Sequence, residues 1–276
     1  MDLFIEVDVD STGASAVPPA PHWFRGVLSS LLSGVADRER QGIKGVSSGG
    51  MLMRRENGRR ERLKSAQGNW DHLLDDLPPA PYWTNLLYTA GDTDLGMVRA
   101  SSVVSGEGHA ELSAGLNCGD EALSDAEYCT WIVDSLRETV NALNPSFGRV
   151  EYRDFDLITQ VDRQLNRHHD DSIHQAREFL RGYAWVTICP RELAARLGGA
   201  RRLEETEAFH CVLPLDGGAV LLQASETPMD FGRTERRRIF PVLAPVLPPG
   251  AAQPPPAHPP NLKAALGDAL SRLNYR

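Results

Sequence analysis

The stretch that decides the fold is residues 209–224, FHCVLPLDGGAVLLQA, in which an Asp-Gly turn separates two short apolar segments. Asp216-Gly217-Gly218 supplies residues that tolerate the positive φ angles of a tight hairpin turn. The flanking segments are rich in Val and Leu, which pack well on a pleated sheet. We therefore predict an antiparallel hairpin with strands over 209–215 and 219–224.

Similar patterns occur upstream of this hairpin. The first residues alternate apolar Leu3, Ile5 and Val7 with acidic Glu6 and Asp8, which predicts a strand with one buried face and one acidic face. Further strands are predicted over 83–89, 97–104, 109–116, 147–155 and 183–188.

Two longer segments carry apolar residues at helical spacing, over 124–144 and 159–181, and a shorter one does so over 22–35. Strands and helices follow one another without a regular β-α-β alternation. The sequence thus predicts an α+β fold, with a largely antiparallel sheet packed against two long helices in a single main domain.

The charge divides the chain unevenly. Residues 36–70 hold nine Lys and Arg against four acidic residues, together with six glycines, whereas the whole chain has a net charge of −8. We expect this basic, glycine-rich segment to be a flexible insert. The expected organisation is a strand and helix over 1–35, the insert over 36–70, the main body over 71–247, a Pro-rich linker over 248–260 and an amphipathic helix over 261–276.

Composition excludes several classes of protein. The four cysteines form no CxxC pair, and we expect them to be reduced. The sequence shows neither a secretory signal nor an apolar run long enough to span a membrane, so we expect a cytoplasmic protein that does not contact membranes. The acidic balance makes nucleic acid an unfavourable partner. No phosphate-binding or dinucleotide motif occurs, and we expect no cofactor.

One cluster could carry chemistry. His168, His169, Asp171 and His174 lie within seven residues and could form a metal or acid/base site. On a helix, however, they would not share one face, and His169 continues an apolar stripe. We favour a structural histidine beside a solvated charge run, and therefore a protein that is not an enzyme.

Other residues are candidates for binding a protein partner. An acidic surface attracts a basic partner and raises the association rate, and tryptophans near a Pro-rich turn can serve as contacts. The predicted partner-binding residues are Glu6, Asp8, Asp10, Asp71, Asp75, Asp76, Trp70 and Trp83.

The C-terminal half resembles a known family. Gly182-Tyr183-Ala184-Trp185, Leu197-Gly198-Gly199 and Val220–Ala224 followed by Pro228 are similar to the pattern of immunity proteins of bacterial polymorphic and type VI secretion toxin systems. The resemblance covers about residues 80–247. It implies a cytoplasmic α+β protein without catalytic residues, which binds and blocks a cognate toxin.

The leading hypothesis is therefore an immunity protein that masks the active or binding surface of a toxin, and the acidic balance favours a basic toxin. An enzyme with a site around His168, His169, Asp171 and His174 is one alternative. A scaffold that docks partners through its C-terminal helix is another. The sequence does not indicate an oligomeric state.

Overall fold

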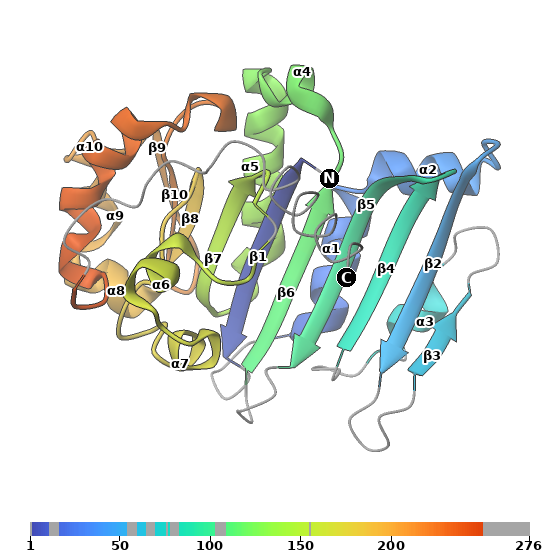
Figure 1. The fold of residues 1–276 in the computed structure, drawn as a ribbon, viewed down its shortest axis with the longest axis horizontal. Helices are drawn as coiled ribbons and strands as arrows, with labels where there is room; N and C mark the ends of the chain where they lie inside the picture. The colour runs from blue at the N-terminus through green and yellow to red at the C-terminus, as the bar shows by residue number, and fades with distance from the viewer. Residues whose placement is uncertain are drawn as a thin grey trace, which may run out of the picture.

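A single ten-stranded antiparallel sheet organises the computed structural model, with the strand order β3-β2-β4-β5-β6-β1-β7-β8-β10-β9 (Figure 1). The structure describes residues 2–10, 17–53, 60–64, 70–75, 77, 83–102, 109–154 and 156–250. The α+β class and the antiparallel sheet predicted from the sequence are confirmed. The strands are β1 (Leu3–Asp10), β2 (Val46–Met53), β3 (Arg60–Leu63), β4 (Trp83–Ala90), β5 (Thr93–Ser102), β6 (His109–Leu116), β7 (Pro145–Tyr152), β8 (Val186–Cys189), β9 (Cys211–Pro214) and β10 (Val220–Gln223).

The helices are mostly short. Only four helices of the described chain exceed six residues: α1 (Pro19–Ser29), α2 (Ser33–Arg40), α5 (Ala126–Asn141) and α10 (Arg233–Leu243). The others are α3 (Asp71–Asp75), α4 (Gly119–Leu123), α6 (Gln160–Leu165), α7 (His169–His174), α8 (Arg191–Arg196), α9 (Gly199–Glu204) and the 3₁₀ turns η1 (Pro228–Asp230) and η2 (Ala244–Val246).

The main core lies between the sheet and the pair α1 and α5, which pass behind it (Figure 1). Side chains alternate between the faces of a strand, so Ile5 and Val7 of β1 enter this core. The two helices approach closely at Gly26, where an added Cβ would lie 2.5 Å from a Thr139 methyl group. A second core cluster unites β8, β9 and β10 with α8, α9 and α10.

The prediction of a second long helix is wrong. Residues 159–181 form two six-residue helices, α6 and α7, because Asn166 adopts the left-handed conformation (φ 51°) and ends α6. Buried Asp162 in α6 accepts hydrogen bonds from Arg167 and Ser172, which lie beyond this break. Satisfying a buried carboxylate outweighs the helical continuity that the apolar stripe predicted.

The predicted flexible insert is also wrong wherever the structure describes it. Residues 46–53 form β2, which pairs along its whole length with β4, and residues 60–63 form the edge strand β3. The charged side chains of β3 suit its position at the sheet edge, since charges discourage pairing with another chain. The predicted first helix over 22–35 is split into α1 and α2. The linker beyond Gly250 and the helix over 261–276 lie outside the described residues, as does Asp76.

Candidate functional site

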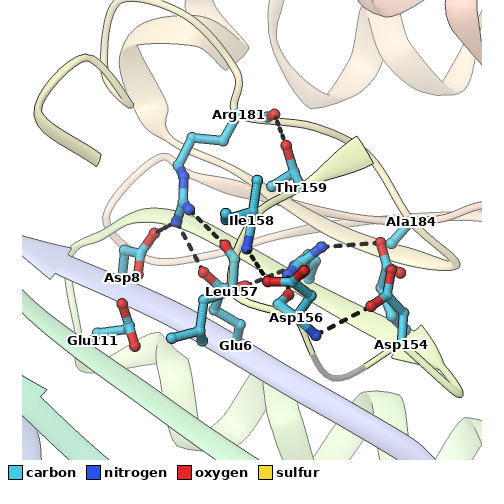
Figure 2. A network of polar contacts seen from close by, with 12 residues as sticks. Glu6, Asp8, Glu111, Asp154, Asp156, Leu157, Ile158, Thr159, Arg181 and Ala184 are labelled. Atoms are coloured by element: carbon cyan, nitrogen blue, oxygen red, sulfur yellow. Dashed lines mark hydrogen bonds and ion pairs between the residues drawn. The ribbon is translucent and has the colours of Figure 1, made fainter. Parts of the chain in front are cut away.

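The acidic side chains of β1 do not face water. Glu6 and Asp8 point away from the main core, as the alternation predicts, but their exposed fractions are only 0% and 1%. The segment 156–159 and helices α6 and α7 cover them and form a second layer over β1 and β7 (Figures 1 and 2). The predicted exposed acidic face is therefore wrong for these two residues, and they are not surface contacts for a partner.

Two buried arginines neutralise these carboxylates. Arg181, which follows α7, donates hydrogen bonds to Glu6 (2.9 Å) and to Asp8. Arg149 lies opposite Glu6 in the neighbouring strand β7 and donates from Nε to its other carboxylate oxygen at 2.7 Å. A second nitrogen of Arg149 reaches Glu151 at 3.2 Å. The two guanidiniums thus clamp Glu6 from both sides, and Figure 2 shows Arg181 above Glu6 and Asp8.

Asp162 anchors the covering layer. Its carboxylate accepts hydrogen bonds from Thr159 (2.9 Å), Ser172 (2.8 and 2.9 Å) and Arg167 (3.0 Å). Arg181 Nε lies 4.0 Å from the same carboxylate. Arg181 therefore connects α6 and α7 to β1 through charged groups that are all removed from water.

His169 belongs to this network rather than to a metal site. Its Nε2 lies 3.0 Å from a Glu111 carboxylate oxygen on β6, and its Nδ1 lies 3.1 Å from an Arg181 nitrogen. Burial lowers the pKa of His169, but the hydrogen bond with Glu111 and the nearby acids outweigh burial and raise the pKa overall.

The structure does not bring the other predicted ligands to His169. His168 and Asp171 are exposed, and the His174 ring packs edge-on against His109 at 4.9 Å. Within the described residues, no group of three or more His, Cys, Asp and Glu side chains is placed to hold a metal ion. The alternative site on His168, His169, Asp171 and His174 therefore does not form as a ligand set.

The ionic layer contains more acid than base. The described chain buries six carboxyl groups (Glu6, Asp8, Glu111, Glu151, Asp154, Asp162) and three guanidiniums (Arg149, Arg181, Arg236). Burial raises the pKa of Asp8 to about 7; Arg181 opposes this shift, while Glu6 and Glu111 add to it. Asp8 therefore holds a proton more easily than an ordinary aspartate does.

The remaining predicted contact residues are scattered over the molecule. Asp71 and Asp75 of α3 are exposed, and Asp75 forms an ion pair with Arg25 at 2.5 Å. Asp10 is partly exposed and lies 3.7 Å from Arg177. Trp70 is buried, and its indole nitrogen donates to Ser48 at 3.1 Å, so the predicted contact role for Trp70 is wrong.

Trp83 belongs to a group of apolar side chains that the sequence did not reveal. The alternation along β2, β4 and β5 places five half-buried apolar side chains on the sheet face opposite the main core, together with the polar pair Asn85 and Arg99. Cross-strand neighbours in this group are Met53 with Trp83, and Leu87 with Met97. The alternating Met51-Leu52-Met53 was the available signal, but it lay in the segment predicted to be flexible. We call this group the methionine face: Met51, Met53, Trp83, Leu87 and Met97.

Comparisons with known proteins show similarity at the level of the fold. No protein-family model matches the sequence, and no curated protein is significantly similar to it. Among solved structures, the chain is similar to the Pseudomonas aeruginosa T6SS protein PA0821. The TM-score is 0.58 at 12% identity, over 89% of this chain and 73% of the other. In the described chain, no helix is long and apolar enough to cross a membrane.

Proposed function

We propose that this chain is a non-catalytic binding protein of the immunity type, which acts in the cytoplasm by masking a surface of a cognate toxin. The observation that carries the proposal is the fold, which is similar over 89% of the chain to that of a T6SS protein. The sequence pattern over about residues 80–247, which resembles immunity proteins of type VI secretion toxin systems, supports the same proposal.

The chemistry of the ionic layer supports a binding role. Glu6, Asp8 and His169, which could otherwise act as acids or bases, are engaged by guanidiniums or carboxylates of the same chain. Their contacts join β1 and β6 to the covering layer of α6 and α7. These groups stabilise the fold, and we therefore assign the binding of a partner to residues on the surface.

Accessible acidic groups indicate the kind of partner. Asp71 and Asp75 extend from α3, and Asp10 is partly exposed at the end of β1. The net charge of −8 adds a long-range attraction for basic surfaces. We therefore propose a basic toxin, whose charge complements these side chains and speeds the encounter.

Co-expression tests this proposal. The product of the gene adjacent to the one for this chain is produced alone and together with the full chain in bacterial cells. We expect the neighbouring product to arrest growth, and the full chain to restore growth and to co-purify with it. A neighbouring product that is harmless, or one whose toxicity persists without complex formation, contradicts the proposal.

A further inference from the structure

The methionine face has no cover in the described part of the chain. Helices α1, α2 and α5 lie behind the sheet, and α6 and α7 lie in front of β1 and β7, whereas no described helix lies in front of β2, β4 and β5 (Figure 1). From Trp83 to Thr89 the burial pattern of β4 alternates, with half-buried residues on this face and buried ones on the other. None of the five side chains belongs to either core cluster.

The composition of the face suits an apolar helix as its occupant. Leu87, Met97 and Met51 offer flexible apolar side chains, and methionine adapts its shape to a docked partner better than branched residues do. Amphipathic helices bind such surfaces through residues spaced three or four apart. The chain has such a segment after residue 250, with the apolar residues Leu262, Ala265, Leu266, Leu270 and Leu273.

The path of the chain places this segment within reach. The described chain ends at Gly250, where an added Cβ would lie 3.1 Å from Leu165 of α6, on the same side of the sheet as the methionine face. Residues 251–261 are rich in proline, and eleven residues at about 3.1 Å per residue would be able to bridge up to roughly 34 Å. From β7, beside which α6 lies, four strand spacings to β4 amount to only about 19 Å.

The lengths also match. A helix over residues 262–276 would be about 22 Å long, and an eight-residue strand such as β4 extends about 27 Å. We propose that residues 262–276 form an amphipathic helix that docks on the methionine face of the same molecule, with Leu266 and Leu270 against Leu87 and Met97. This inference goes beyond the proposed function; because Trp83 lies on this face, the tail would compete with any partner that uses it.

Methionine oxidation in the full chain measures this contact directly. Dilute peroxide converts accessible methionines to sulfoxides, and mass spectrometry gives a rate for each site. Met229, which is 43% exposed, serves as an internal reference. In the wild-type chain we expect Met51 and Met97 to oxidise more slowly than Met229. Leu266→Glu/Leu270→Glu should accelerate both several-fold and leave Met229 unchanged.

The matched control is Ser271→Glu, which adds a charge on the opposite side of the same helix and should leave all rates unchanged. Equal rates for Met97 in the wild-type and Leu266→Glu/Leu270→Glu chains overturn the proposal. So does protection that disappears on dilution, because a second copy then covers the face.

A second measurement changes a residue on the sheet side of the proposed contact. Leu87→Glu should release the tail, and trypsin should then cleave at Arg272 several-fold faster than in the wild-type chain. An unchanged cleavage rate in a folded Leu87→Glu chain also overturns the proposal. Both experiments use the free protein, so their failure is distinct from a failure to bind a toxin.

Discussion

The guanidinium of Arg181 donates a hydrogen bond to the carboxylate of Asp8, which precedes it by 173 residues in the sequence. The same nitrogen reaches Glu6 at 2.9 Å. This contact ties the covering layer of α6 and α7 to the central strand β1. It turns what the sequence presents as an exposed acidic strand into the interior of the molecule.

Loss of Arg181 should destabilise the fold strongly. Arg181→Met leaves Glu6 and Asp8 buried with less neutralising charge, and breaking one side of a buried ion pair costs about 3–5 kcal/mol. Urea unfolding gives the difference in free energy of unfolding. The matched control is Arg153→Met, which removes an exposed ion pair with Asp120 and should cost at most about 1 kcal/mol. Equal losses in the two variants would show that the layer is not held by its charges.

Replacing Asp8 should change how stability depends on pH. The pKa of Asp8 is raised to about 7 in the folded chain, mainly by burial, so the folded state holds a proton that the unfolded state releases near pH 4. The stability that Asp8 contributes is present below about pH 4 and is lost as the pH rises through about 7.

Asp8→Asn mimics the protonated form and lacks this titration. The wild-type chain should therefore lose stability relative to Asp8→Asn between about pH 5 and pH 8, on the order of 2–3 kcal/mol. Parallel urea titrations at several pH values measure the difference. A wild-type stability that stays constant relative to Asp8→Asn over this pH range would mean that the Asp8 carboxylate is ionised throughout and held by Arg181.

The close approach of α1 and α5 makes Gly26 sensitive to any side chain. Gly26→Ala would place its Cβ against Thr139 and should cost about 1–3 kcal/mol through overpacking. Gly34 in α2 has open space around it, so Gly34→Ala should be neutral or stabilise by up to about 1 kcal/mol. Thermal unfolding compares the two variants. A Gly26→Ala chain as stable as Gly34→Ala would contradict the tight α1–α5 contact.

The acidic side chains of α3 should govern recognition of a basic partner. Asp71→Lys/Asp75→Lys reverses two exposed charges and should slow association with the proposed toxin by an order of magnitude or more at low salt. Asp92→Lys/Asp94→Lys makes the same change in net charge at the β4–β5 turn and the start of β5, and should have a smaller effect. Stopped-flow or surface-based association rates decide the comparison. Identical association rates for the two variants would mean that α3 does not form the contact with the partner.

Much of the sheet follows from local pattern. The segments flanking Asp216-Gly217-Gly218 pair as β9 and β10, with Leu213 opposite Leu221, as the turn residues predicted. The long helix α5 also lies within its predicted range. Such elements are predictable because turn chemistry and apolar spacing are properties of neighbouring residues.

The ionic layer could not be predicted in the same way. An alternation of Glu6 and Asp8 with Ile5 and Val7 looks the same whether the acidic side meets water or a second layer. The partners that decide between these cases, Arg149 and Arg181, are distant in sequence. Strand β2 was likewise not predicted, because its segment is rich in glycine and charge and its pairing with β4 depends on tertiary contacts. The methionine face was missed for this reason.

The most direct test of the central claim uses the Asp8→Asn chain in cells that produce the neighbouring gene product, the proposed toxin. If the buried charges serve only the fold and the surface performs the binding, then Asp8→Asn, shown by circular dichroism to be folded, should protect cells as well as the wild type. A folded Asp8→Asn chain that gives no protection would contradict this account and indicate a chemical role for the layer.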